Sequence, residues 1–130
     1  MIEIIIPFKT PTVNHLYGQR PGGFGRARFI KPEARKIRKK ITELIDELPR
    51  CMKDDLPKDE QLKVTTLVYE SWYTKKGDVK KKDLANREKF LIDSVFSALG
   101  IDDKFIFEHT MKKVQSDEEK VVIRIEQNSY

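Results

Sequence analysis

Two segments of the sequence carry apolar residues at the three-to-four spacing that gives a helix one apolar face. In the first, residues 32–48, Pro32 suits the first helical position and Pro49 ends the segment. The second covers residues 86–99 and is followed by Gly100, which favours a helix C-terminus. The two predicted apolar faces consist of Ala34, Ile37, Ile41, Leu44 or Ile45, and Leu48, and of Phe90, Leu91, Val95, Ala98 and Leu99. Each face requires a second element to pack against.

Strand-like runs lie before, between and after these two helices. The candidates are residues 1–8, 26–30, 62–72, 105–111 and 120–126. We expect the last two to form a closing hairpin or two edge strands, with residues 116–119 as the turn. Polar, glycine-rich or proline-rich loops are predicted at residues 10–25, 50–60 and 74–82. This order predicts an α+β fold, with a small mixed β-sheet packed with two main helices, in a single domain over residues 1–130.

The composition excludes a membrane-spanning protein and points to a charged partner. The longest apolar runs are only a few residues, so we expect no membrane span. The single cysteine, Cys51, cannot form an internal disulfide and fits a reducing, cytoplasmic location. Between Lys9 and Lys40 there are ten Lys or Arg and one acid, Glu33. Clustered positive charge is typical of nucleic-acid binding, although a solvated basic helix gives the same pattern.

Carboxylates stand at both ends of the second predicted helix, within the most lysine-rich part of the chain. They are Asp83, Asp93, Asp102 and Asp103. Oxygen ligands of this kind suit Mg²⁺ or Mn²⁺, and two such metals can clamp the attacking and leaving oxygens of a phosphodiester. Each residue also has an ordinary structural reading. Asp83 suits a helix cap, Asp102 and Asp103 suit a turn, and Asp93 suits an ion pair with Lys89 one helical turn earlier.

The spacing of these residues resembles the RusA family of Holliday junction resolvases. The family pattern is Asp-x-Asp-Asn-x-x-Lys, then Asp-Ala-Leu, then Asp-Asp. The corresponding residues here are Asp83-Leu84-Ala85-Asn86-Arg87-Glu88-Lys89, Asp93-Ser94-Val95 and Asp102-Asp103. Near the N-terminus, Pro11-Thr12-Val13-Asn14 with Tyr17 soon after is also similar to the family. The likeness extends from residue 3 to about residue 125.

The resemblance implies a homodimeric, Mg²⁺- or Mn²⁺-dependent endodeoxyribonuclease that resolves four-way DNA junctions by paired nicks. It implies that Asp83 and Asp103 are catalytic metal ligands, with Asp102 as a further candidate, and that Lys89 is the essential lysine. Supporting roles fall on Asn14, Asn86 and Asp93, although Asn86 also suits a helix cap. The second aspartate of the family pattern is Ala85 here, and a methyl group cannot bind a metal. A branched-DNA-binding relative that does not cut is therefore the alternative.

A wider set of residues is predicted to contact DNA. It consists of Arg20, Phe24, Arg26, Arg28, Arg35, Arg38, Lys39, Lys80, Lys81 and Lys82. The arginines and lysines would contact phosphates, and Phe24 would act as a wedge against unstacked bases or pack on the core. His15 and His109 are separated in sequence, and both are read as ordinary residues. A third reading, a basic RNA-associated or ribosome-associated protein, is supported by charge alone.

The helix over residues 86–99 also bears on assembly. At 1.5 Å per residue it is about 20 Å long, which places Asp83 and Asp103 beyond opposite ends. Metal ligands have to converge within about 4–5 Å of one another. One chain brings the two carboxylates together only if the helix is shorter than this. Otherwise we expect a twofold dimer that brings Asp83 of one chain beside the equivalent of Asp103 in the other, with apolar residues 90–96 in the interface.

Overall fold

The computed structural model describes residues 1–11, 17–19 and 28–128. The two main helices are α2 (Pro32–Asp46) and α4 (Ala85–Leu99), which confirms both predicted helices to within two residues. The smaller elements are α3 (Arg50–Asp54) and the 3₁₀ helix η1 (Asp103–Phe105). The strands are β1 (Ile2–Ile6), β2 (Tyr17–Gln19), β3 (Arg28–Ile30), β4 (Leu62–Glu70), β5 (Ile106–Gln115) and β6 (Lys120–Gln127).

Four strands form a mixed sheet in the order β1-β6-β4-β5. Strand β5 runs parallel to β4, whereas β6 runs antiparallel to both β4 and β1. The mixed sheet of the predicted α+β fold is therefore confirmed, but the closing hairpin is wrong. Strands β5 and β6 lie on opposite sides of β4, and the segment between them crosses its end, where the Ser116 amide donates to the Glu70 carbonyl at 3.1 Å. Of these two strands, β5 lies at an edge of the sheet, whereas β6 lies between β1 and β4.

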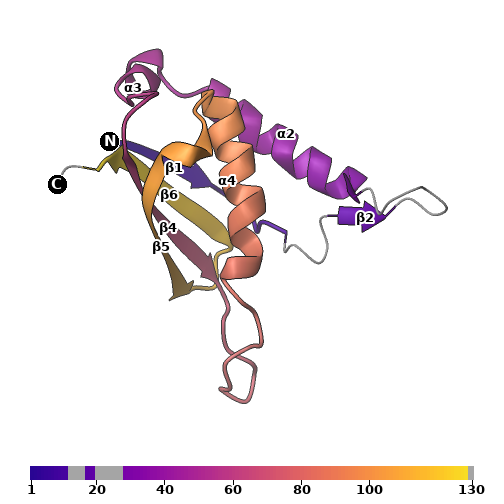
Figure 1. The fold of residues 1–130 in the computed structure, drawn as a ribbon. Coiled ribbons are helices and arrows are strands. Elements are labelled where there is room, and N and C mark those ends of the chain that lie inside the picture. The colour runs from indigo at the N-terminus through magenta and orange to yellow at the C-terminus, as the bar shows by residue number, and fades with distance from the viewer. Residues whose placement is uncertain (12–16, 20–27, 129–130) are drawn as a thin grey trace.

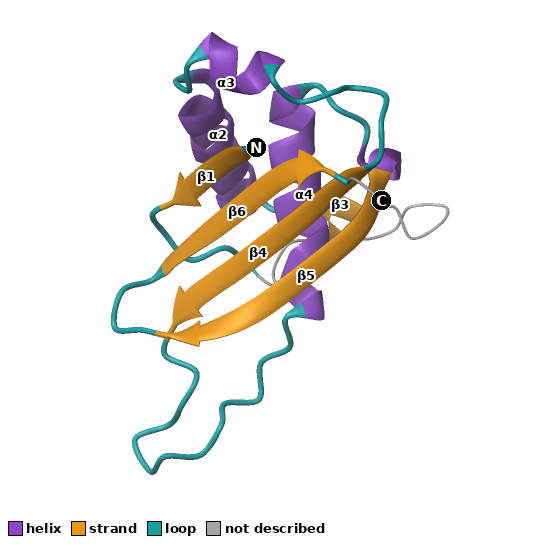
Figure 2. Ribbon diagram, turned by 90° about the vertical axis from the view of Figure 1, so that its left-hand side faces the viewer, coloured by secondary structure: helices purple, strands orange, loops and turns teal. Residues whose placement is uncertain are grey.

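Both main helices pack on one face of this sheet (Figures 1 and 2). Strand β4 alternates strictly between buried and half-buried side chains, and its buried side belongs to the same core as the helices. Gly100 adopts a left-handed φ of 71° and ends α4, as predicted. The apolar residues from Phe90 to Phe96 are all less than 7% exposed and lie in this core. They cannot form the predicted dimer interface, because one chain already buries them.

Two predicted loops contain secondary structure, and several residues named in the sequence analysis lie outside the described ranges. Strands β2 and β3 pair antiparallel, so residues 17–19 belong to a short hairpin rather than to a loop. The charged connection after α2 contains α3, which its polar sequence did not indicate. Asn14, His15, Arg20, Phe24 and Arg26 lie outside the described residues. Among the residues that are described, no helix is long and apolar enough to cross a membrane.

Candidate active site

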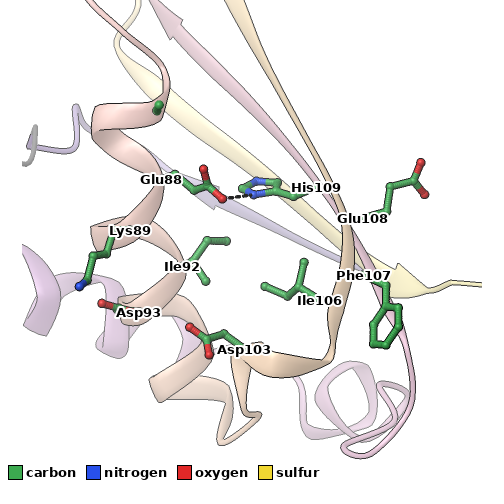
Figure 3. Close-up of a pocket in the computed structure, with 10 residues that line it drawn as sticks. Glu88, Lys89, Ile92, Asp93, Asp103, Ile106, Phe107, Glu108 and His109 are labelled. Carbon is green, nitrogen blue, oxygen red and sulfur yellow. Dashed lines mark hydrogen bonds and ion pairs between the residues drawn. The ribbon is translucent and has the colours of Figure 1, made fainter.

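A hollow of about 560 Å³ opens between α4 and β5 (Figure 3). Helix α4 contributes one row of side chains, η1 contributes one acid, and β5 closes the other side. The residues that line it are Ala85, Glu88, Lys89, Ile92, Asp93, Asp103, Ile106, Phe107, Glu108 and His109. Three residues expected from the sequence, Lys89, Asp93 and Asp103, therefore share one hollow although they come from two elements.

Lys89 and Asp93 project from the same side of α4, one turn apart, and Asp103 follows from η1 (Figure 3). Lys89 and Asp103 are exposed, and Asp93 is half-buried. No ion pair closer than 4 Å joins Lys89 to Asp93 in the described part of the chain, so the predicted helix-surface ion pair is not formed. The amine and both carboxylates remain open to the hollow and can contact a bound group.

Asp83 and Asp102 occupy different places from Asp103. Asp83 is exposed in the segment before α4 and does not line the hollow. Asp102 accepts a hydrogen bond from the Lys104 amide at 2.9 Å and so caps η1, which is a turn role. The capping readings of Asp83 and Asn86 are wrong, because α4 has Leu84 at its N-cap position and no side-chain cap. Half-buried Asn86 instead lies within the first turn of α4.

Ala85 lines the hollow, so the position of the missing family aspartate does face the candidate site. One helical turn further on, Glu88 lines the same hollow, and the Nδ1 atom of His109 lies 3.0 Å from its Oε1 atom. The other ring nitrogen of His109, Nε2, lies 3.0 Å from the Oγ1 atom of buried Thr66. If the Thr66 hydroxyl donates to Nε2, then Nδ1 carries the proton and donates to Glu88. The chain Thr66–His109–Glu88 thus orients a carboxylate that the sequence did not single out.

The sequence reading of His109 as an ordinary residue missed this contact. The available signal was its place in an alternating strand, where it falls on the same side as Met111 and faces the helices. A polar residue on the covered side of a strand requires a partner, and α4 supplies it. Glu88 gave no such signal, because a glutamate on a helix surface is common.

The start of α4 is anchored by a buried ion pair that the sequence also did not reveal. Arg87 is 1% exposed and forms two hydrogen bonds with the carboxylate of Glu70, at the end of β4. The guanidinium also lies over the ring of buried Trp72, 5.5 Å from its centroid. Lys82 adds a hydrogen bond to Glu70 at 3.1 Å. Burial alone would raise the pKa of Glu70, but the hydrogen bonds and charges of Arg87 and Lys82 hold that pKa below its ordinary value.

The described members of the predicted DNA-binding set differ in their exposure to solvent and in their contacts within the fold. On α2, Arg35 and Lys39 are exposed. Arg38 instead turns inward, where its Nε atom donates to the Ser94 hydroxyl at 3.1 Å and its guanidinium lies 5.2 Å from the Phe90 ring centroid. Before α4, Lys81 is exposed, whereas Lys80 and Lys82 are half-buried. For Arg28 the structure describes only the backbone, in β3.

The oxygen donors of the hollow have the chemistry that Mg²⁺ prefers. Within the described residues, no group of three His, Cys, Asp or Glu side chains lies close enough to hold a metal ion. Mg²⁺ usually binds through one or two carboxylates and completes its coordination with water and substrate phosphates, so fewer than three protein ligands can hold it.

Comparison with known proteins identifies the family of the chain. No curated protein matches the chain. The family model described as endodeoxyribonuclease RusA matches residues 7–126, which include the hollow, both main helices and most of the mixed sheet. Because this match covers nearly all of the 130 residues, the chain belongs to the RusA endodeoxyribonuclease family.

Proposed function

We propose that the protein is a Mg²⁺-dependent, structure-selective endodeoxyribonuclease that resolves four-way DNA junctions by paired nicks. One observation carries the proposal: Lys89 and Asp103 face one hollow, in a chain that matches the family from residue 7 to residue 126. Family membership supports action on DNA, and the net charge of +5 suits a polyanionic partner.

In this proposal four residues, Asp83, Lys89, Asp93 and Asp103, have defined tasks. Asp103 and Asp83 act as metal ligands, and Asp93 supports them from the half-buried side of α4. Lys89 neutralises the charge that develops on the phosphate oxygens during the reaction. Mg²⁺, or Mn²⁺ in its place, would polarise the phosphate and lower the pKa of a bound water. The exposed amine of Lys89 beside two carboxylates provides both signs of charge that this chemistry requires.

The proposal includes a homodimer. Asp83 precedes the first residue of α4, whereas Asp103 belongs to η1, which brings the chain back beside Asp93 (Figure 3). Only Asp103 lines the hollow of its own chain. A twofold dimer with antiparallel α4 helices would add a second chain's carboxylate at the position of Asp83 to that hollow. Two such sites also match the two symmetric strands of a four-way junction.

The alternative function is binding of branched DNA without cleavage. The observation that favours it is that Ala85 lines the hollow and presents a methyl group where the family pattern has a carboxylate. The observation that favours cleavage is Glu88, a carboxylate one turn away in the same hollow and held by His109. Both functions require DNA at this surface, and they differ only in the chemistry that follows binding.

A synthetic four-way junction with end-labelled strands separates the two functions. The junction is incubated with the wild type and with Asp103→Asn, with and without Mg²⁺, and both binding and nicking are read on gels. The proposal expects paired nicks only for the wild type with Mg²⁺, and binding by both proteins. Binding of the junction without nicks in Mg²⁺ or Mn²⁺ would select the alternative. Nicking at equal rates by both proteins would remove Asp103 from the site.

A further inference from the structure

A finger formed by residues 71–82 projects beyond the end of the sheet, between β4 and α4 (Figures 1 and 2). It contains five lysines and one acid, Asp78. It leads directly into α4, the helix that carries Ala85, Lys89 and Asp93. A partner that lies along α4 would therefore also meet the finger.

Hydrogen bonds fix the shape of this finger. At its tip, the Thr74 amide donates to the Asp78 carbonyl at 2.7 Å, and the Gly77 amide donates to the Thr74 carbonyl at 2.9 Å. Gly77 has a φ of 88°, which a residue with a side chain rarely adopts. Further back, the Lys80 amide donates to the carbonyl of Trp72, whose indole is buried and donates to the Val68 carbonyl. The finger is thus a hairpin-like projection anchored in the core.

The finger exposes an apolar pair. Tyr73 is 48% exposed and Val79 is 61% exposed, and these two residues form an antiparallel bridge. Directly opposite residues in such a bridge place their side chains on the same face. A tyrosine ring and an isopropyl group therefore stand side by side in solvent. Exposed Lys75, Lys76 and Lys81 lie along the same projection.

An apolar pair surrounded by lysines fits a nucleic acid better than an apolar protein surface. The lysines match phosphates, and an aromatic ring can stack on a base wherever a base face is accessible. In a continuous duplex each base pair is covered by its neighbours. At a branch point the stack is interrupted, so base faces can be reached at a lower unstacking cost.

We propose that Tyr73, supported by Val79, stacks on a base at the branch point and makes the protein prefer branched over continuous DNA. This inference rests on the proposed function, because it assumes that the partner is a DNA junction. The lysines of the finger contribute affinity for either form, since phosphate contacts do not distinguish branched from linear DNA.

The test compares affinity for a four-way junction with affinity for a linear duplex of the same sequences, in the absence of Mg²⁺. Tyr73→Ala should weaken junction binding about 5- to 150-fold, as expected for the loss of one stacked base, and leave duplex binding unchanged. Tyr73→Phe keeps the ring and should keep the preference. Lys75→Ser with Lys76→Ser should weaken both DNA forms equally. Ile5→Ser removes an equally exposed apolar side chain from β1, at the opposite edge of the sheet from β5, and should change neither affinity.

A cross-linking experiment on the unmutated protein provides a second measurement. With 5-iododeoxyuridine at the branch point, irradiation should cross-link Tyr73, and with the same base placed well inside one arm it should not. If the wild type prefers junctions and Tyr73→Ala has the same preference, the inference is wrong and the proposed function stands. If the wild type binds junction and duplex equally, both are wrong. A cross-link to Tyr73 from the arm position alone would also overturn the inference.

Discussion

Position 85 carries a methyl group where the family pattern has a carboxylate, and another carboxylate lies close to it in the structure. Ala85 and Glu88 are three residues apart on α4, so their side chains share one face of the helix. Both line the same hollow, and His109 holds one oxygen of Glu88. The Glu88 side chain is 48% exposed, and we propose that its second oxygen serves in place of the missing aspartate, oriented by His109 as metal ligands commonly are by a neighbour.

The first prediction exchanges these two positions. Glu88→Gln should weaken Mn²⁺ binding at least about tenfold, measured by calorimetry, and slow junction nicking in parallel. Adding Ala85→Asp to Glu88→Gln should recover the affinity, because the carboxylate returns to the same hollow from the same helix face. Glu47→Gln is the matched control, since Glu47 packs beside β1 at the far edge of the sheet. Equal Mn²⁺ affinities for the wild type, Glu88→Gln and Glu47→Gln would show that Glu88 plays no part.

At the scale of elements, the position of α4 depends on the pair between Arg87 and Glu70. This pair joins the first turn of α4 to the end of β4, and both side chains are almost fully buried. A buried ion pair gives little net stability compared with apolar residues, but the loss of one partner leaves a charge unpaired in the interior. The pair therefore fixes where the hollow begins rather than adding greatly to stability.

We predict that Glu70→Gln destabilises the protein by about 3–5 kcal/mol at neutral pH, measured by urea unfolding. Arg87→Met with Glu70→Met should cost less than the sum of the two single changes, because neither charge is then left alone. The pKa of Glu70 is lower in the folded protein than its ordinary value of 4.5. Its contribution is therefore fully present above that value and is lost as the pH falls through the folded pKa. The stability gap between the wild type and Glu70→Gln should shrink below about pH 4.5; a constant gap would contradict the assignment.

Helix α2 carries both exposed basic side chains and one, Arg38, that contacts residues within the fold, and we predict different effects of changing them. Arg35→Glu with Lys39→Glu should weaken binding of junction and duplex alike and reduce the salt dependence of the DNA affinity. Both side chains are exposed, so both can contact phosphates. Arg38→Met should instead lower the melting temperature, since Arg38 contacts Ser94 and Phe90 within the fold. Binding curves at several salt concentrations and thermal melts check both expectations. An unchanged salt slope in the double variant would exclude this face of α2 from the DNA contact.

The elements show where sequence reasoning succeeds and where it stops. The spacing of apolar residues located α2 and α4, because each helix buries a single face that its own sequence encodes. The sequence could not place β6 between β1 and β4, because the alternation of residues within a strand does not indicate which strands it pairs with. Lys89, Asp93 and Asp103 were found through the family pattern. Glu88, His109 and Arg87 were missed because their roles depend on contacts between residues 17 to 43 positions apart.

For the whole molecule, the placement of the carboxylates bears on how a complete site is assembled. The described residues contain no three-ligand metal group, and Asp83 does not line the hollow that Asp103 lines. The expected interface over residues 90–96 is excluded because those side chains are buried in the core. A dimer therefore has to use other surfaces, while its function in the proposal stays the same: to bring the two carboxylates into one hollow.

The last prediction tests this sharing by exchanging subunits. Asp83→Asn and Asp103→Asn are each expected to be inactive as homodimers. After mixing, a heterodimer would combine both changes in one site and leave the other site intact, so junctions should acquire a single nick instead of paired nicks. Lys89→Met mixed with Asp103→Asn is the matched control, because both residues line the hollow of one chain and no intact site can form. Native mass spectrometry confirms that exchange has occurred. Full exchange without any nicking in the first mixture would show that each chain builds its own site.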